Sequence, residues 1–300
     1  MLKAVILAAG MGTRMKSKTP KVLHEVLGKT MVEYSIVAAK AAGAEQICII
    51  IGHGGEQVKK KIGAGVTYVE QKEQLGTGHA VMCAKEFIGK EGQTLILCGD
   101  TPLIKGDTLI NLVERHKEQG NQVTMLSTIL GNPSGYGRII RNDKGEFVKN
   151  VEDKDATREE RMFKEVNSGM YLFESGALYD SLSKLTNDNA QGEYYLPDTL
   201  EIIRSEGGKV DAVIAENETE IMGVNSRVQL MDATRIMQER INYGLMKEGV
   251  TILAPELTFV GPDVVVEQDV TIYPNSFIYG NLVLREGTVV PPGTVLGLEL

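Results

Sequence analysis

One short segment near the N-terminus constrains this chain more than any other. An apolar run at residues 4–7 leads directly into Ala8-Ala9-Gly10-Met11-Gly12-Thr13-Arg14. Such a run predicts a buried first strand, and the two glycines let the backbone turn tightly after it because they carry no Cβ atom. Peptide N–H groups in a tight turn of this kind point inward and form a concave anion site. The segment therefore predicts a phosphate-binding turn at the end of a buried strand.

Two cations accompany this turn. Arg14 follows it directly and Lys21 comes after Pro20. A guanidinium can bind phosphate oxygens through two parallel hydrogen bonds. The two commoner phosphate loops are excluded, because no Gly-x-x-x-x-Gly-Lys-Ser/Thr run exists and Met15 stands where a dinucleotide fingerprint needs its third glycine.

The composition excludes several classes of protein. The chain has 300 residues and a formal net charge of −8, so no basic field favours nucleic acid or a membrane surface. We find no apolar run near the ~18 residues that cross a bilayer, and we expect a cytoplasmic location. Cys48 and Cys98 lie inside apolar runs, where reduced core residues are the expectation.

The first 130 residues alternate between two kinds of pattern. Apolar or β-branched runs predict strands, and segments with helical periodicity that stop near glycines predict helices. Alternation of this kind predicts an α/β fold with a mostly parallel sheet covered by helices on both faces. Ligands on such sheets bind beyond the carboxyl ends of the strands. The predicted strands are 46–51, 94–98 and 122–130, and the predicted helices are 31–42, 78–87 and 107–119.

The middle of the chain predicts further elements. A turn signal at 142–145 separates two strand-like runs, 136–141 and 146–151, and predicts a hairpin. Strands are also predicted at 166–173 and 209–214, with a helix around 201–205. One long helix is expected over 226–247, with Ser226 as its N-cap and Gly249 after its end.

A new period begins at Val260. Apolar residues recur every six positions without a break, which is neither helical nor ordinary strand spacing and marks a hexapeptide β-helix. The predicted inward positions are Val260, Val266, Ile272, Ile278, Leu284, Val290 and Leu296. The pattern is similar to left-handed β-helix domains, with three hexads per coil and about two coils.

Polar groups follow two predicted β segments. Asp100 comes after Gly99 at the end of strand 94–98, and Asn225 ends residues 223–225. Carboxylate and amide oxygens suit Mg²⁺, which takes one or two protein oxygens together with phosphate and water. From the residues alone, a turn-forming role explains Asp100 equally well, and a turn or cap role explains Asn225 better than a metal-binding role. Residues 71–80 open a helix with two glycines around Thr77, which suits the packing of a flat ring against backbone.

The string Leu7-Ala8-Ala9-Gly10-x-Gly12-Thr13-Arg14-Met15, with Pro20-Lys21, resembles the signature of sugar-1-phosphate nucleotidyltransferases. Further segments are similar, in order, to bacterial N-acetylglucosamine-1-phosphate uridyltransferases, which usually also carry a C-terminal glucosamine-1-phosphate acetyltransferase. These segments are Gln71, 74–80, 99–100, 132–138, 151–152, 167–169, 189–195 and 223–225. The resemblance implies a nucleotidyltransferase domain at 1–225, a linker helix at 226–249 and a β-helix at 250–300.

The resemblance also implies roles for individual residues. The uridine nucleotide would be held by Leu7, Ala8, Ala9, Gly10, Gly12, Gln71, Gly76 and Thr77. Arg14 and Lys21 would bind the phosphates as catalytic groups with Asp100. The amino sugar would be bound by Gly99, Gly137, Glu152, Asn167 and Asn225, and Mg²⁺ by Asp100 and Asn225. Ser168 stands where the family pattern has Thr, a mild change.

The implied reaction is transfer of UMP from UTP to N-acetylglucosamine 1-phosphate. This reaction yields the sugar nucleotide used in cell-wall synthesis, and the implied assembly is a homotrimer formed through the β-helix. Acetyltransferase activity is not expected, because the hexads stop at Leu296. Two alternatives stay open: a hexose-1-phosphate uridylyl- or thymidylyltransferase of the same fold, and a non-catalytic regulatory homologue.

Overall fold

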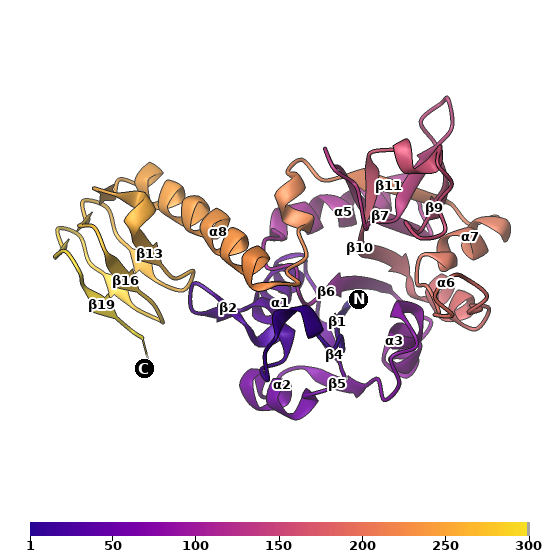
Figure 1. The fold of residues 1–300 in the computed structure, drawn as a ribbon, viewed down its shortest axis with the longest axis horizontal. Coiled ribbons are helices and arrows are strands. Elements are labelled where there is room, and N and C mark those ends of the chain that lie inside the picture. Colours follow the sequence, from indigo (N-terminus) through magenta and orange to yellow (C-terminus); the bar gives the residue numbers. More distant parts are fainter. Residues whose placement is uncertain (299–300) are drawn as a thin grey trace. The chain divides into compact units, whose positions relative to one another are not determined.

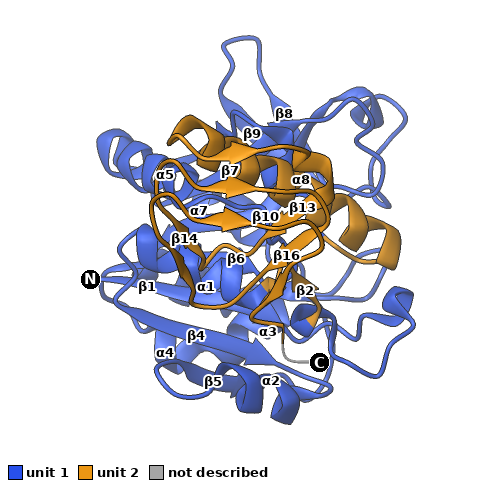
Figure 2. Cartoon of the chain, turned by 90° about the vertical axis from the view of Figure 1, so that its left-hand side faces the viewer, with its two compact units in different colours: residues 1–23, 32–223 blue, residues 24–31, 224–300 orange. Residues whose placement is uncertain are grey.

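The computed structural model describes residues 1–298 and divides the chain into two compact units. Unit 1 consists of residues 1–23 and 32–223. Unit 2 consists of residues 24–31 together with the chain from residue 224 onward (Figure 2).

Unit 1 is built on a mixed, mostly parallel sheet (Figure 1). Its main path runs in the order β11-β7-β10-β6-β1-β4-β5, and β10 alone on this path pairs antiparallel with its neighbours β6 and β7. The strands are β1 (Leu2–Ala8), β4 (Gln46–Ile51), β5 (Thr67–Glu70), β6 (Gln93–Cys98), β7 (Val123–Ile129), β10 (Glu165–Glu174) and β11 (Val210–Ile214). The predicted α/β class is therefore confirmed.

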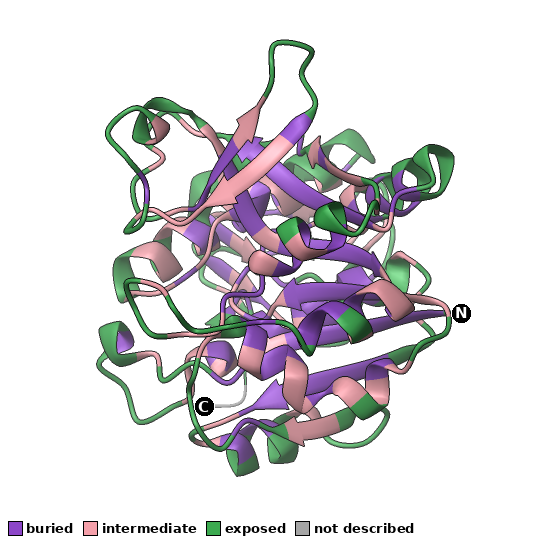
Figure 3. Ribbon diagram, turned by 90° about the vertical axis from the view of Figure 1, so that its right-hand side faces the viewer, coloured by how far each residue is buried: buried purple, intermediate pink, exposed green. Residues whose placement is uncertain are grey.

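Helices cover both faces of this sheet. Side chains alternate along β1, so that Ala4 and Ile6 enter one apolar cluster while Val5 enters the other, and all three are fully buried. A sheet buried on both faces explains why its central strands read as nearly continuous apolar runs. In Figure 3 the strands in the middle of the sheet are coloured mostly as buried. The helices are α1 (Met31–Ala41), α2 (Gly55–Ile62), α3 (Thr77–Cys83), α4 (Lys85–Ile88), α5 (Gly106–Gln119), α6 (Ser175–Leu182) and α7 (Asp198–Ser205).

The predicted hairpin forms as β8 (Arg138–Arg141) and β9 (Phe147–Val151), which pair antiparallel. It joins the sheet where Arg138 pairs with Val166 of β10. The same part of β10 carries a register shift between Asn167 and Tyr171. Such irregularities re-aim side chains in the bulged strand.

Several expectations about unit 1 differ from the structure. The helix predicted over 78–87 is two helices, because α3 ends at Cys83 and Ala84 takes a non-helical conformation before α4. No pattern in the sequence predicted α2, β5 or α6.

Unit 2 contains the predicted long helix, α8 (Arg227–Lys247). Its N-cap is Ser226, whose hydroxyl accepts a hydrogen bond from the Gln229 N–H at 3.2 Å. Gly249 follows the helix with a φ of +92°, a conformation that favours glycine. Within residues 1–298, no helix combines the length and the apolar character needed to cross a bilayer.

Short parallel strands then stack as a β-helix. Paired residues lie eighteen positions apart, as Thr258 with Ser276 and Val265 with Val283, which confirms three hexads per coil. The predicted positions Ile272 and Ile278 are fully buried in the core of these coils. The strands are β12 (Thr251–Ile252), β13 (Thr258–Val260), β14 (Val265–Val266), β15 (Thr271–Ile272), β16 (Ser276–Ile278), β17 (Val283–Leu284), β18 (Val289–Val290) and β19 (Val295–Leu296).

A small hairpin from the N-terminal part of the chain completes unit 2. It consists of β2 (Glu25–Val26) and β3 (Lys29–Thr30). The Lys29 Nζ atom lies 2.6 Å from Asp263 Oδ1, and Gly28, at a φ of +83°, leaves no free space for a Cβ atom beside the Tyr279 ring. The sequence carries no local signal for this association.

Candidate active site

Two adjoining cavities open in unit 1 beside the carboxyl ends of β1 and β6. The turn-side cavity has a volume of about 300 Å³ and contains the glycine turn in its lining. The hairpin-side cavity has a volume of about 280 Å³ and includes residues near the β8–β9 hairpin. Both are lined by Leu7, Thr77, Cys98 and Glu193. Two ligands placed in these cavities would therefore meet at a common wall.

The turn-side cavity brings together most residues predicted to bind the nucleotide and its phosphates. They come from β1, from the segments that follow β1, β5 and β6, and from the start of α3. The predicted residues in its lining are Leu7, Ala8, Ala9, Gly10, Lys21, Gln71, Gly76, Thr77 and Asp100. Among the described residues that line either cavity, Gly12, Arg14 and Gly99 are not included.

The positions of these three residues have separate reasons. Gly12 has a φ of +61°, and a Cβ atom there would lie 2.7 Å from the Lys21 Cβ, so glycine permits the close approach of Lys21. Arg14 is exposed in a short 3₁₀ turn, Thr13–Met15, which is anchored by the buried Met15. Gly99 donates its N–H to the Leu7 carbonyl at 2.9 Å and so places the next residue beside β1.

Lys21 and Asp100 form an ion pair inside the turn-side cavity. Their side chains are only 13% and 19% exposed. A carboxylate in this position is a hard oxygen ligand that opens onto a cavity, which fits Mg²⁺. The ammonium group of Lys21 occupies one side of that carboxylate and offers positive charge to an anion.

Segment 71–80 is fixed by backbone contacts. The Gln71 Nε2 atom donates to the Gly76 carbonyl at 3.1 Å, and Gln71 is buried. Gly76 has a φ of +106°, and a Cβ atom there would lie 2.6 Å from the Tyr194 carbonyl oxygen. Gly78 donates its N–H to that same oxygen at 2.7 Å. Only glycine fits at position 76, so this edge of the cavity is made of backbone.

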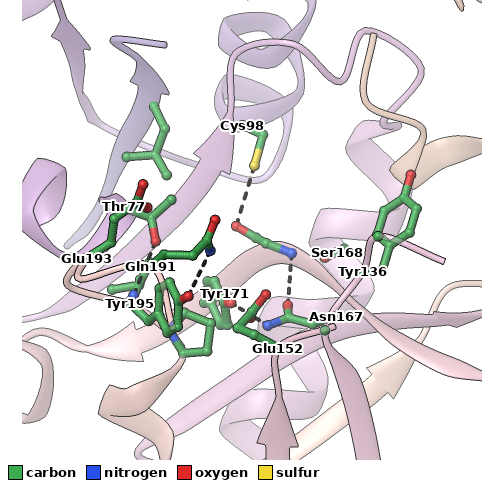
Figure 4. Close-up of a pocket in the computed structure, with 16 residues that line it drawn as sticks. Thr77, Cys98, Tyr136, Glu152, Asn167, Ser168, Tyr171, Gln191, Glu193 and Tyr195 are labelled. Carbon is green, nitrogen blue, oxygen red and sulfur yellow. Dashed lines mark hydrogen bonds between the residues drawn. The ribbon is translucent and has the colours of Figure 1, made fainter. Parts of the chain in front are cut away.

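The hairpin-side cavity collects three residues predicted to bind the sugar, Gly137, Glu152 and Asn167. Figure 4 shows Glu152 and Asn167 among the side chains that line it. The amide of Asn167 is held at both ends. Its Nδ2 atom donates to the Tyr171 hydroxyl at 2.6 Å, and its Oδ1 atom accepts from the Gly169 N–H at 2.8 Å. The orientation of the amide is therefore fixed by its neighbours.

Glu152 is an acidic group in a partly desolvated environment. Burial raises the pKa of its carboxyl, a hydrogen bond from Asn150 lowers it, Asp155 and Asp153 raise it, and Arg138 lowers it. A Cβ atom on Gly137 would lie 2.9 Å from the Glu152 Oε1 atom, so glycine leaves the carboxylate its space.

The cavities also contain residues that the sequence analysis did not assign. Tyr136 and Tyr195 lie in segments 132–138 and 189–195, which are similar to the family, so the resemblance could have identified them as candidate site residues. Cys98 corrects an expectation: it is half-buried and lines both cavities instead of the core. Burial and the nearby Asp100 raise the pKa of its thiol to about 12, so it is protonated at neutral pH. The unassigned lining residues with polar side chains are Cys98, Tyr136, Ser168, Tyr171, Gln74, Gln191, Glu193 and Tyr195.

Asn225 lies in unit 2, immediately before Ser226, and its N–H donates to Gln229 Oε1 at 2.8 Å. Its pairing with Asp100 around a metal stays a prediction. The described residues contain no group of three or more His, Cys, Asp or Glu side chains arranged for a metal ion. Mg²⁺ needs no such group where substrate phosphates supply ligands.

Comparison with known proteins identifies the family. The profile of the nucleotidyl transferase family matches residues 3–219, which is more than half of the chain. The chain belongs to the nucleotidyl transferase family. The matched region includes every residue that lines the two cavities.

Three similar proteins are each named "Bifunctional protein GlmU". The one from Caldanaerobacter subterraneus subsp. tengcongensis is 52% identical over 293 residues, which is 98% of this chain and 64% of that protein. The one from Halalkalibacterium halodurans is 48% identical over 98% of this chain and 65% of its own length. The one from Clostridioides difficile is 50% identical over 93% of this chain and 61% of its own length. The chain thus spans less than two thirds of these relatives.

For a nucleotidyl transferase, the two-cavity arrangement has a direct chemical meaning. The turn-side cavity offers backbone, a lysine and a carboxylate, which suit a nucleotide with its phosphates and a divalent cation. The hairpin-side cavity offers amide, carboxylate and phenol groups, which suit a ligand with several hydroxyl or amide groups.

Proposed function

We propose that this nucleotidyl transferase transfers UMP from UTP to N-acetylglucosamine 1-phosphate, giving UDP-N-acetylglucosamine and pyrophosphate. The observation that carries the proposal is the shared wall of the two cavities, with a lysine and a carboxylate in the turn-side cavity and amide, carboxylate and phenol groups in the hairpin-side cavity. The resemblance to bacterial N-acetylglucosamine-1-phosphate uridyltransferases supports the choice of substrates. The product would serve cell-wall synthesis in the cytoplasm.

In the turn-side cavity, the uracil would lie against the backbone of residues 71–80. Gln71 is held by Gly76, and Gly76 packs directly against the Tyr194 backbone, so this edge of the site is made of backbone groups. Leu7, Ala8, Ala9, Gly10 and Thr77 would complete the nucleotide site, with Gly12 shaping the turn.

In the hairpin-side cavity, Glu152 would accept hydrogen bonds from sugar hydroxyls. Asn167 and the backbone of Gly137 would face the sugar and its acetamido group. Sites that pair buried polar groups with a substrate reject analogues that leave those groups unpaired. This supports an N-acetylated sugar over a plain hexose.

The chemistry requires little covalent help from the protein. A phosphate oxygen of the sugar phosphate attacks the α-phosphorus of UTP in line, and the bond to the pyrophosphate leaving group breaks. The attacking group is already an anion at neutral pH, so no general base is needed. Lys21 and Arg14 would neutralise charge on the departing pyrophosphate, and the adjacent cavities would align the reactants.

Asp100 would hold Mg²⁺, with further ligands from the substrate phosphates and water. The ion would supply charge neutralisation and alignment for the two phosphate groups. Asp100 fits this role because its carboxylate lines the cavity and pairs with a cation, Lys21, that a metal or a phosphate can displace.

The test is pyrophosphate release from UTP with and without N-acetylglucosamine 1-phosphate, in the presence of Mg²⁺. We expect release only with the sugar phosphate, and chelation of the metal should stop it. Equal rates with glucose 1-phosphate would favour the hexose alternative, and no release with any sugar phosphate would favour a regulatory homologue.

We also propose that the chain forms a homotrimer through its β-helix. Several apolar residues on the coils are about half exposed, which is a liability for an isolated surface. These residues are Val265, Val283, Val289 and Val295. Light scattering at micromolar concentration should give three times the chain mass, and a monomer would contradict the proposal.

A further inference from the structure

Asn150 of β9 connects the two side chains that carry the sugar assignment. Its Nδ2 atom donates to Glu152 Oε1 at 3.2 Å, and its Oδ1 atom accepts from Asn167 Nδ2 at 3.2 Å. Asn150 itself is half-buried and is not among the described residues that line the hairpin-side cavity. Its contacts thus reach the site only through Glu152 and Asn167.

The direction of these hydrogen bonds is determined by their partners. The oxygen of the Asn167 amide is used by the Gly169 N–H, so its nitrogen must face Tyr171 and Asn150. Asn150 therefore presents its oxygen to Asn167 and its nitrogen to Glu152. An ionised carboxylate can only accept, so this arrangement satisfies both neighbours at once.

We propose that Asn150 is a positioning residue for the amino sugar: its amide holds the Glu152 carboxylate and the Asn167 amide in one fixed arrangement. The inference rests on the proposed function, because it deepens the role of the same sugar site. Asn150, which lies behind the cavity wall, would thus contribute to the selection of an N-acetylated sugar phosphate.

The hydrogen bond from Asn150 also affects the ionisation of Glu152, which lies among several other charged groups. Carboxylates of Asp153, Asp155 and Asp198 act on this region together with Glu152, and Arg138 is the cation that opposes them. The charge of Glu152 also contributes to raising the pKa of the Tyr171 and Tyr195 phenols. A hydrogen bond donated to Glu152 favours its ionised form, which is the form that accepts from sugar hydroxyls.

The backbone is shaped around this contact. Asn150 pairs with Ile139 across the β8–β9 hairpin, and Ile139 lies two residues after Gly137 in the sequence. A Cβ atom on Gly137 would lie 2.9 Å from both Asn150 Oδ1 and Glu152 Oε1. A glycine at position 137 therefore leaves room for the amide and the carboxylate to meet.

The decisive variant is Asn150→Asp, which keeps the shape but replaces the donor by a second carboxylate. We expect KM for N-acetylglucosamine 1-phosphate to rise by about tenfold or more, while KM for UTP changes by less than about twofold. The acid limb of the kcat/KM profile for the sugar should move to higher pH, because the added charge raises the pKa of Glu152. Asn150→Ala should also raise the sugar KM and should move the acid limb in the same direction by a smaller amount, because the hydrogen bond that lowers the pKa of Glu152 is lost and no charge is added.

The matched control is Asn217→Asp. Asn217 caps a 3₁₀ turn by accepting a hydrogen bond from the Thr219 N–H, which an aspartate does equally well. It adds the same charge to unit 1 and should leave both KM values and the pH profile unchanged.

A second measurement does not depend on turnover. The Glu152 carboxyl can be titrated by carbon NMR, with its signal assigned by its loss in Glu152→Gln, and Asn150→Asp should shift that titration upward. An unchanged titration and an unchanged sugar KM in an active enzyme would overturn the inference. So would equal losses for both substrates together with a lower melting temperature, which indicate a purely structural role. A wild-type chain that transfers no UMP refutes the proposed function instead, and the titration still reports the contact.

Discussion

The side chains of Lys21 and Asp100, 79 positions apart in the sequence, form an ion pair in the turn-side cavity. Lys21 follows the glycine turn and Asp100 follows β6, and the parallel pairing of β1 with β6 brings the two segments to one edge of the sheet. The cation predicted for phosphate thus neutralises the carboxylate predicted for the metal.

This pairing predicts opposite effects on metal binding and on turnover. Lys21→Met should tighten Mn²⁺ binding in the absence of nucleotide, because the ammonium no longer competes for Asp100. The same variant should lose at least ~10²-fold in kcat, since a transition-state charge contact is removed. Asp100→Ala should abolish both metal binding and turnover. Electron paramagnetic resonance of free Mn²⁺ measures the first, and pyrophosphate release measures the second; Asp100→Ala with near-normal activity at saturating Mg²⁺ would contradict the assignment.

Arg14 is predicted to act on the phosphates although it is exposed and lies outside both cavity linings. Arg14→Ala should lower kcat by at least ~10²-fold, the lower range for one lost charge contact in a transition state. The exposed Lys16→Ala is the control and should be near wild type. A change in KM for UTP alone would show that Arg14 contributes to ground-state binding instead.

The sugar site predicts selection for the acetamido group. We expect kcat/KM for N-acetylglucosamine 1-phosphate to exceed that for glucose 1-phosphate by at least about tenfold, because polar groups placed for the acetamido group would be left unpaired. Glu152→Gln should lower kcat/KM for the acetylated sugar, whereas the exposed Glu159→Gln should not. Competition between the two sugar phosphates in one reaction measures the ratio directly, and a ratio of one would favour the hexose alternative.

Gly76 predicts a coupled loss of stability and nucleotide affinity. Its φ of +106° and ψ of 176° lie in a region that is essentially restricted to glycine, and an added Cβ atom would meet the Tyr194 backbone. Gly76→Ala should therefore cost about 1–3 kcal/mol of unfolding free energy and weaken UTP binding. Urea unfolding and calorimetry measure the two effects. Gly131→Ala, with no atom within 4 Å of the new Cβ, should change neither.

Asp198 predicts a pH-dependent stability. Burial, with Glu201, Glu152 and Asp155 nearby, raises the pKa of its carboxyl from an ordinary 3.8 to about 6 in the folded chain. The protonated form is favoured on folding, so this contribution is present below the unfolded pKa and is lost as pH rises through about 6.

Asp198→Asn should accordingly be more stable than the wild type at pH 8, by on the order of 1 kcal/mol because the carboxyl is only partly buried. The difference should fade as pH falls below 4. Melting temperatures across this range measure it, with the exposed Asp188→Asn as control. A constant difference at all pH values would mean that ionisation of Asp198 is not the cause.

Local patterns in the sequence predicted much of the fold. The strands β4 and β6, the helix α5 and the cap at Ser226 follow from apolar runs, helical periodicity and capping chemistry, all of which act within a few residues. The hexads predicted the coils because one inward residue in six is a local requirement of that structure. The break at Ala84 was not predicted, since no proline or glycine marks it.

The sequence by itself determined the strand-and-turn segment at 4–14, the α/β class and the β-helix, because each depends on local periodicity or on glycine conformations. The tertiary structure alone decided which side chains meet. It paired Lys21 with Asp100, placed Cys98 in a cavity wall and joined Asn150 to Glu152 and Asn167. It also gave residues 24–31 to unit 2. These contacts depend on strand order, on a register shift in β10 and on long-range packing, and periodicity within one segment carries no information about its distant partner.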